Sequence, residues 1–538
     1  MTPPFASLAA LAGLCLLTLT AAPAPAAGLR ILGLFPLPGH SHNIFFKAMM
    51  ETLAERGHEV VMFSPFPHKK APPNYTDVDT SNGAPSFTNN FSFDKVSTAP
   101  TVLPGQAMWQ SMTRIGALSG PGLCRQVFSM PEFGALMKGG YGRFDAVFTE
   151  VFGSDCWAAV AHKMAVPLIS MSSAPDVTWM HERFGSVDNP SYLINVFTGY
   201  TSSMTLWERT VNAFTALYVK WLHKHIIQDP SEAVVREFFG EGLPPIPEMV
   251  KNTSLLLLNR HVSIHSARPV TPNIVHVGGL HIRPSPSDSL DPELRRWMDE
   301  AEHGVIFFSL GSMMRSDSLP ADKRDALLGA FAKLPQRVLW KFETDAVQLP
   351  PNVRIGKWLP QLAVINHPKT VLFMTHGGLM GTMEALFAGV PMLGIPLFAD
   401  QGSNTELYRA LGIAQRLDIR TATQDGVLAV LRELTETPKY RQRAREVAAL
   451  FRDRPRQAAD EAVWWTEYVV RHRGAPHLRP VAVDLPLYQY LLLDVAALVL
   501  AAALVVAVLV RKALALLLGA LSSSAAKNPR SLEKKKNM

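Results

Sequence analysis

The chain has 538 residues, of which 48% are hydrophobic and 18% are charged. This balance supplies apolar material for two or three domains of ordinary size and excludes a largely disordered protein. The formal net charge of +7 comes partly from lysines at the C-terminus. No basic stripe is interleaved with aromatic residues, so nucleic acid is not expected as a partner.

The N-terminus carries an apolar stretch from Ser7 to Thr20, followed by small residues up to Ala27. A short apolar core ahead of small residues predicts a cleavable signal peptide over residues 1–27. An N-terminal membrane anchor is the alternative, but the apolar stretch is short for a span.

Residues 28–267 are expected to form a Rossmann-like domain. Leu29–Phe35 is typical of a buried parallel strand, Phe45–Arg56 has helical spacing, and Val60–Phe63 indicates the next strand. A strand, helix and strand in this order predict a parallel sheet. Two further strands are expected, at residues 145–149 and 167–170.

A stretch rich in proline and glycine, residues 268–292, is typical of an interdomain linker. Residues 293–472 are predicted to form a second Rossmann-like domain, whose last element is a helix over Ala458–His472. Two such domains facing each other form a cleft at the carboxyl ends of their strands. The strands expected in the second domain are Val305–Leu310, Val338–Phe342, Val371–Met374 and Pro391–Ile395.

Near the C-terminus, Leu491–Val510 is apolar apart from Asp494 and long enough to cross a bilayer core of about 30 Å. The basic residues Arg511 and Lys512 are expected to stop the span. We therefore predict a transmembrane helix over residues 488–510 and a basic cytosolic tail over residues 511–538.

Lys535 and Lys536 lie four and three places from the end of the sequence, in a Lys-Lys-Lys-Asn-Met terminus that resembles the dilysine retrieval signal of endoplasmic-reticulum membrane proteins. A plain basic tail at the membrane surface is the alternative. These signals predict a single-pass type I protein of the endoplasmic reticulum membrane with a lumenal body, where Cys124 and Cys156 could form a disulfide. Three sequons are candidates for glycosylation in that compartment: Asn74, Asn90 and Asn252.

The second half carries a dense set of glycine and polar residues, in the segments Trp358-Leu-Pro-Gln361, Thr375-His-Gly-Gly378, Glu384-Ala385, Gly389-Val-Pro391 and Asp400-Gln401. Their types and spacing resemble the nucleotide-sugar signature of the UDP-glycosyltransferase family. The resemblance extends from Leu29 through the C-terminal span, and residues 471–480 and 488–494 look like the insect-type members. It implies an α/β fold of the GT-B arrangement, with UDP-sugar on the C-terminal domain and a small lipophilic acceptor on the N-terminal one.

The chemistry of UDP explains several of these residue types. Trp358 can stack on the flat uracil. Glu384 can accept both ribose hydroxyls, and Gln361 can add an amide contact. The family resemblance implies that Asp400 and Gln401 bind the hydroxyls of the sugar.

The diphosphate is expected at a strand-to-helix turn, where His376 is followed by Gly377 and Gly378 and backbone N–H groups attract anions. Ser309, at the end of a neighbouring strand, can contact the same phosphates. Family members usually carry Ser or Asn where this chain has Gly381, so either one hydrogen bond to the diphosphate, worth about 0.5–1.5 kcal/mol, is lost or a backbone N–H group replaces it. This departure leaves open a second interpretation, a catalytically silent lumenal partner subunit that binds UDP-sugar or lipophiles.

His42, directly after the first strand, matches the catalytic histidine of the family. An imidazole is suited to removing the proton of a hydroxyl acceptor near neutral pH, in a direct attack that inverts the anomeric carbon. A carboxylate should orient the ring, as in a catalytic triad. Glu150 takes the place of the family's aspartate, and Asp155 keeps the residue type; we slightly favour Asp155. His40 is an alternative base.

No metal or other cofactor is expected, because UDP-sugar is a co-substrate and its diphosphate can bind backbone N–H groups. An Asp-x-Asp motif of the kind that holds Mg²⁺ occurs at Asp77 and Asp79, but we interpret it as a solvated loop. Association into a homo- or hetero-oligomer is left open.

The donor sugar is expected to be glucose. In the vertebrate glucuronosyltransferases that the chain resembles, an arginine before the interdomain linker plausibly binds the carboxylate of the sugar. A gapless match places Asn259 there, with Arg260 adjacent, and a shift of one residue would restore the charge.

Overall fold

The computed structural model describes residues 28–81, 87–94, 104–174, 176–283, 290–345 and 347–526. The expected signal peptide and the dilysine-like terminus lie outside the described residues. The chain divides into two compact units, Met1–Arg479 and Pro480–Met538. The domain boundaries expected within these units stay a prediction.

The first sheet of the larger unit has seven parallel strands in the order β3-β2-β1-β4-β5-β6-β7. It contains all four strands expected in the first half of the chain. The strand order reverses between β1 and β4, and the carboxyl ends of such strands border a binding site in open α/β sheets. The strands are β1 Arg30–Leu34, β2 Glu59–Ser64, β3 Tyr75–Asp79, β4 Ala146–Glu150, β5 Leu168–Ser172, β6 Thr253–Leu258 and β7 Ile274–His276.

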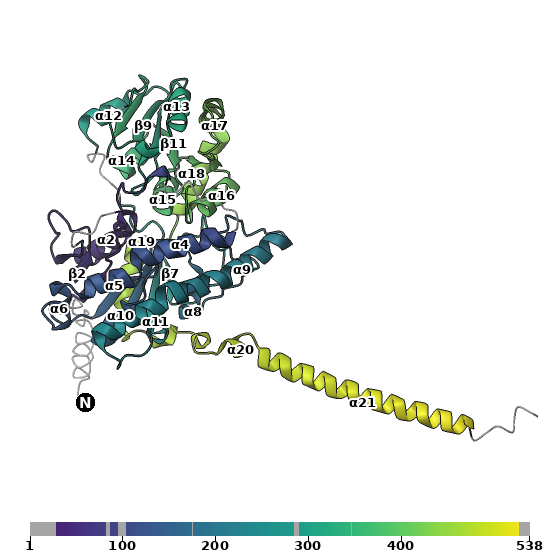
Figure 1. The fold of residues 1–538 in the computed structure, drawn as a ribbon. Helices are drawn as coiled ribbons and strands as arrows, with labels where there is room; N and C mark the ends of the chain where they lie inside the picture. Colours follow the sequence, from purple (N-terminus) through teal and green to yellow (C-terminus); the bar gives the residue numbers. More distant parts are fainter. Residues whose placement is uncertain are drawn as a thin grey trace, which may run out of the picture. The chain divides into compact units, whose positions relative to one another are not determined.

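The second sheet has six parallel strands in the order β10-β9-β8-β11-β12-β13 and reverses between β8 and β11. The two parallel sheets with covering helices confirm the predicted fold class (Figure 1). The strands are β8 Val305–Ser309, β9 Arg337–Lys341, β10 Val353–Gly356, β11 Thr370–Thr375, β12 Met392–Gly394 and β13 Ala414–Arg416.

Helices cover both faces of the first sheet, and each face has its own apolar core. α2 begins at His40, five residues before the expected start, because extended Gly39 precedes a first turn of polar residues that periodicity does not reveal. The helices are α2 His40–Glu55, α4 Pro104–Ser119, α5 Pro121–Phe128, α6 Pro131–Met137, α7 Ala158–Met164, α8 His181–Phe184, α9 Leu206–Leu222, the π-helix η2 His223–Gln228, α10 Asp229–Phe239 and α11 Ile246–Lys251.

The second sheet is covered in the same way. The last helix of the unit, α19, returns to the first sheet and lies beside α2 (Figure 1). The helices are α12 Pro292–Asp299, α13 Ala321–Phe331, α14 Gln361–Asn366, α15 Leu379–Ala388, α16 Gln401–Ala410, α17 Gln424–Glu436, α18 Pro438–Arg452 and α19 Ala458–Arg471.

Cys124 and Cys156 form a disulfide between α5 and the residues before α7. It closes a loop across the helices on one face of the first sheet. The possibility left open by the sequence is therefore settled in favour of a bond.

The smaller unit contains a short helix, α20 Leu487–Tyr490, and a long one, α21 Leu493–Ala526. Leu493–Ser524 is apolar and long enough to cross a membrane. The helix does not end at Val510 as expected but continues past Arg511 and Lys512, because both residues favour helix and the sequence after them is rich in alanine and leucine. At 1.5 Å per residue, its 34 residues extend about 50 Å, further than a bilayer core of about 30 Å.

Candidate active site

A cavity of about 590 Å³ in the larger unit is lined by loops and helices that follow strands of the first sheet and by strands, loops and helices of the second. It lies where the strand order reverses in each sheet, which is where ligands bind in this class of fold. Most of the site residues predicted from the sequence line it: His42, Ser309, Trp358, Gln361, His376, Gly378, Glu384, Asp400 and Gln401.

His42 and Glu150 meet at the reversal point of the first sheet. α2 follows β1 and Glu150 ends β4, the neighbouring strand, so that Nδ1 of His42 lies 2.5 Å from Oε1 of Glu150. The hydroxyl of Ser173 donates to the same oxygen at 3.2 Å. Burial lowers the pKa of His42, but the charge and hydrogen bond of Glu150, with a smaller contribution from Asp400, raise it above its ordinary value.

Asp155 lies elsewhere, and our preference for it as the partner of His42 is wrong. Its two oxygens accept hydrogen bonds from the guanidinium of Arg183 at 2.7 and 2.9 Å, and Gln228 donates a third at 3.1 Å. Both members of this ion pair are buried. Asp155 follows β4 by five residues and has turned into the helical layer, whereas Glu150 is the last residue of β4 and reaches the cavity through its contact with His42.

His40 lies two residues before His42 in α2 but has a different environment. Its ring lies edge-on to Phe66 and Trp358, with centroid distances of 5.2 and 5.1 Å. Burial, with a contribution from Lys47, lowers the pKa of His40. His40 therefore lies at the aromatic end of the cavity, whereas the carboxylate of Glu150 contacts His42.

The aromatic end of the cavity contains the residues predicted to bind uracil and ribose. Trp358 is 52% exposed, and the ammonium of Lys341 lies 5.7 Å from its ring centre. Glu384 is buried on α15, where it accepts a hydrogen bond of 2.7 Å from the amide of Gln361. Burial raises the pKa of Glu384 to about 7, although the Gln361 hydrogen bond opposes this shift.

The departure at Gly381 has a local consequence. A Cβ atom at this position would lie 2.8 Å from the amide nitrogen of Gln361. Its absence leaves room for the Gln361 side chain to reach Glu384. Gly381 is therefore compatible with the contact between Gln361 and Glu384, the two residues predicted to bind ribose.

His376, Gly377 and Gly378 form the turn between β11 and α15. Gly377 has a φ of +86°, and a Cβ at Gly378 would lie 2.4 Å from Nε2 of His376, so the turn requires both glycines. Burial, with a contribution from Lys341, lowers the pKa of His376 to about 4. At neutral pH His376 is therefore a neutral imidazole, able to donate one hydrogen bond near the N-terminus of α15.

Asp400 and Gln401 lie at the start of α16. Asp400 accepts a hydrogen bond of 2.7 Å from Asn404, and burial raises the pKa of its carboxyl group. The amide oxygen of Gln401 accepts hydrogen bonds from the backbone N–H groups of Leu397 and Phe398. Because Asp400 also acts on the charge of His42, this end of the cavity adjoins the histidine.

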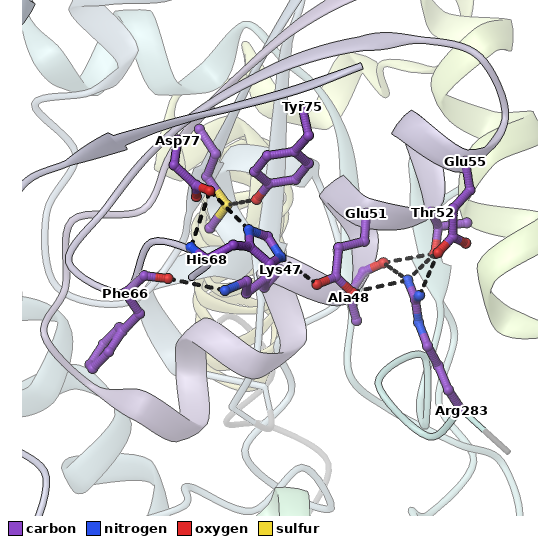
Figure 2. Close-up of polar contacts among 11 residues, drawn as sticks. Lys47, Ala48, Glu51, Thr52, Glu55, Phe66, His68, Tyr75, Asp77 and Arg283 are labelled. Carbon is purple, nitrogen blue, oxygen red and sulfur yellow. Dashed lines mark hydrogen bonds and ion pairs between the residues drawn. The ribbon is translucent and has the colours of Figure 1, made fainter. Parts of the chain in front are cut away.

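The Asp-x-Asp motif is not a solvated loop, which corrects our expectation. Asp77 and Asp79 belong to β3, and Asp77 accepts hydrogen bonds from the backbone and ring of His68 at 3.1 and 2.9 Å. The other ring nitrogen of His68 contacts Glu51 at 2.8 Å (Figure 2). Neither aspartate lines the cavity.

Asn259 and Arg260 do not line the cavity either. The amide nitrogen of buried Asn259 donates to the carbonyl of Ser173 at 3.0 Å. The guanidinium of Arg260 is bonded to Asp176 and to the carbonyl of Ser266. Arg268 contacts the same aspartate at 2.8 Å. The positive charge of Arg260 is therefore already paired with Asp176 in a buried cluster.

Sequence reasoning missed the apolar half of the cavity. Its side chains come from α4 and from loops after β4 and β5, where no local motif marks them. Ser173 and His281, which also line the cavity, were missed for the same reason. The apolar side chains include Ile115, Leu118, Phe152, Val177, Trp179 and Phe197.

The asparagines of the three sequons are exposed: Asn74, Asn90 and Asn252. Their side chains are therefore accessible to a glycosylating enzyme. Glycosylation itself stays a prediction.

Comparison with known proteins agrees with this geometry. Residues 34–527 match the family described as UDP-glucoronosyl and UDP-glucosyl transferase. UDP-glucosyltransferase 2 of Dactylopius coccus is 40% identical over 470 residues, covering 87% of this chain and 89% of that protein. UDP-glucuronosyltransferase 2B15 of Rattus norvegicus is 31% identical over 489 residues, covering 88% and 90%.

Solved structures share the fold. Phytolacca americana UGT2, complexed with UDP-2fluoro-glucose and pterostilbene, superposes with a TM-score of 0.53 at 16% identity and covers 82% of this chain and 100% of that one. With the family match over most of its length, the chain belongs to the UDP-glucuronosyl and UDP-glucosyl transferase family and is a UDP-glycosyltransferase that uses a UDP-sugar donor.

Proposed function

We propose that this protein transfers glucose from UDP-glucose to a hydroxyl group of a small lipophilic acceptor, with inversion at the anomeric carbon. The observation that carries the proposal is the pair of His42 and Glu150 at a cavity with one polar and one apolar half. The apolar half suits a lipophilic acceptor, and the polar half suits a nucleotide-sugar.

In the proposed reaction, Nδ1–H of His42 is bonded to Glu150, so Nε2 is available to accept the proton of the acceptor hydroxyl. The acceptor oxygen forms a bond to the anomeric carbon as the bond from that carbon to the UDP oxygen breaks. The electron pair leaves with UDP. Asp400 and Gln401 hold the sugar beside His42 during this exchange.

The leaving UDP is bound at the other end of the cavity. Trp358 stacks on uracil, Glu384 and Gln361 bind the ribose, and the diphosphate lies at the N-terminus of α15. The backbone N–H group of Gly378 stabilises the negative charge, whereas the N–H of Gly377 donates to the hydroxyl of Thr375 at 3.2 Å. The ring N–H of His376 and the hydroxyl of Ser309 contribute further hydrogen bonds, and we expect no metal requirement.

Glucose is favoured as the donor sugar because the charge of Arg260 is bonded to Asp176 in a buried cluster outside the cavity. Asn259 is neutral and is buried outside the cavity as well. The relative that is 40% identical is named a glucosyltransferase.

We also propose a location in the endoplasmic reticulum membrane, with the larger unit in the lumen. α21 supplies the membrane anchor, and exposed sequons and a disulfide suit an oxidising lumen. Glycosidase treatment of microsomal protein should increase its electrophoretic mobility, and an unchanged mobility would contradict a lumenal body.

The catalytic proposal is tested with the full-length protein in microsomes, supplied with UDP-glucose, a panel of phenols and EDTA. We expect UDP release and a glucoside of inverted configuration, identified by nuclear magnetic resonance. His42→Ala should lower kcat by about 10²–10⁴-fold, whereas His40→Ala should act mainly on KM for the donor. Binding of UDP-glucose without UDP release for any phenol would instead support the silent partner subunit.

A further inference from the structure

His281 is a buried histidine in the cavity wall that the proposed reaction does not use. Its side chain is 1% exposed, and neither ring nitrogen makes a hydrogen bond of normal geometry. Nε2 lies 3.8 Å from Oε1 of Glu384. A buried polar group without a partner is costly in a folded protein, so its position beside a predicted ribose-binding carboxylate indicates a role in the bound state.

The turn that carries His281 is hydrogen-bonded to the residues that follow β6. The N–H of Gly278 donates to the carbonyl of Arg260 at 3.0 Å, and the N–H of Gly279 donates to the side chain of Asn259 at 3.3 Å. A Cβ at Gly278 would lie 2.5 Å from that carbonyl, and Gly279 has a φ of +81°. Both glycines are therefore required for the turn to approach β6 this closely.

The segment that follows His281 is hydrogen-bonded to α2 through Arg283. Arg283 donates to Glu55, to the carbonyl of Ala48 and to the hydroxyl of Thr52, at 2.8, 2.8 and 3.0 Å (Figure 2). His281 is thus held between two anchors in the first half of the chain. Its ring nevertheless reaches α15 in the second half, where Glu384 lies.

The two oxygens of Glu384 have different neighbours. Oε2 accepts the hydrogen bond from Gln361, while Oε1 faces His281 across a gap too long for a hydrogen bond. Burial lowers the pKa of His281 to about 4, against a smaller opposing contribution from the backbone of Met380, so the ring is a neutral imidazole with a single N–H that it can direct toward the carboxylate. When ribose hydroxyls donate to Glu384, its ionised form is favoured, and a negative charge attracts that N–H to about 2.8 Å.

We propose that His281 is a positioning residue of the donor site, whose ring N–H supports the Glu384 carboxylate while that carboxylate binds the hydroxyls of the UDP ribose. The inference rests on the proposed role of Glu384. It makes recognition of ribose depend on a residue anchored in the acceptor half of the protein.

The test compares the affinities of the detergent-solubilised full-length protein for UDP and for 2′,3′-dideoxyuridine diphosphate, which lacks both ribose hydroxyls. The wild type should prefer UDP. His281→Ala should weaken UDP binding by about tenfold or more and leave the dideoxy nucleotide little changed. His281→Gln retains an N–H donor and should restore part of the preference.

Two further variants isolate the contact. His276→Gln is a control, because His276 is half-buried with a buried, unpartnered Nε2 but does not line the cavity; its nucleotide preference should equal that of the wild type. Glu384→Gln should lose the preference, and adding His281→Ala to it should have little further effect if the residues act together.

The possible failures are distinguishable. If the wild type binds both nucleotides equally, the proposed ribose role of Glu384 is wrong. If the wild type prefers UDP and His281→Ala keeps the same ratio, or weakens both nucleotides equally, then His281 only fills space and the inference is overturned while the proposed function stands.

Discussion

The carboxylate of Glu150, the last residue of β4, lies 2.5 Å from Nδ1 of His42 in the first turn of α2. Their two elements are neighbours only because β1 and β4 pair side by side at the reversal of the strand order. The contact assigns the hydrogen of the neutral imidazole to Nδ1 and leaves Nε2 as the basic nitrogen. It also makes the basicity of His42 depend on Glu150.

We expect the acid limb of the pH dependence of kcat/KM to lie above the ordinary pKa of histidine, because Glu150 raises the pKa of His42 and only the neutral ring accepts a proton. Activity should rise as pH increases through this limb. Glu150→Gln removes the charge and hydrogen bond that raise the pKa of His42 and leaves the effect of burial, which lowers it. The acid limb should therefore move to lower pH, and the maximal rate should fall about 10²-fold or more. An unchanged limb in Glu150→Gln would show that the carboxylate does not act on the base.

Asp155→Asn should affect stability rather than chemistry. Removing one charge of the buried pair with Arg183 leaves an unpaired guanidinium, which costs about 3–5 kcal/mol. We expect a clearly lower Tm, measured by the fluorescence of the purified protein, with kcat per folded molecule close to that of the wild type. Glu150→Gln is the control and should show the opposite pattern, and a loss of kcat in Asp155→Asn with an unchanged Tm would contradict the assignment.

The residues proposed to bind the donor could be placed in one site from the sequence because their signal is local. Trp358, Gln361, His376 and Glu384 follow one another at a characteristic spacing, and all four line the cavity. The strands were predictable for a similar reason, since each buried parallel strand is a short apolar run bounded by turns. Their pairing order explains why Ser309 and His376, at the ends of adjacent strands, lie close together.

Other features depend on contacts between distant parts of the chain. Arg183, which comes later in the sequence, donates a hydrogen bond to the carboxylate of Asp155. This contact could not be foreseen from the sequence, and it leaves Glu150 as the partner of His42. The importance of His281 depends on α15, which no pattern around His281 reveals. The end of α21 was misplaced because Arg511 and Lys512 indicate where charge lies along a helix, not where the helix stops.

Binding of UDP-glucose should release protons near neutral pH. Burial raises the pKa of Glu384 to about 7, so about half of the free protein carries the protonated form there, while ribose hydroxyls bind the ionised form. Affinity should therefore increase as pH rises through 7 and become constant above it. Calorimetry in two buffers with different ionisation enthalpies measures the proton release, and Glu384→Gln should abolish this component; an identical pH dependence in that variant would assign the release to another group.

Reduction of the disulfide should destabilise the larger unit. Cys124 and Cys156 are separated by 32 positions in the sequence, and closing a loop of this size stabilises a protein by about 2–4 kcal/mol. We expect dithiothreitol to lower the Tm of the wild type and to leave the Tm of the double variant Cys124→Ser with Cys156→Ser unchanged. Two free thiols in the unfolded, unreduced protein would show that the bond does not form.

UDP-glucose should be used in preference to UDP-glucuronate when both are present at equal concentration. The two donors differ at C6, where glucuronate carries a carboxylate that needs a cationic partner. Arg260, the candidate nearest in the sequence, is bonded to Asp176 outside the cavity, and Lys341 is paired with Glu343 at 2.7 Å near Trp358, the residue proposed to bind uracil. An uncompensated carboxylate loses a charge-assisted hydrogen bond worth about 1.5–3 kcal/mol, so we expect glucoside to exceed glucuronide by at least about tenfold. The sugar on the product is identified by mass. Mainly glucuronide would refute the prediction and direct attention to Arg114, the other arginine or lysine among the described residues that line the cavity, and Arg114→Gln would then be expected to reverse the preference.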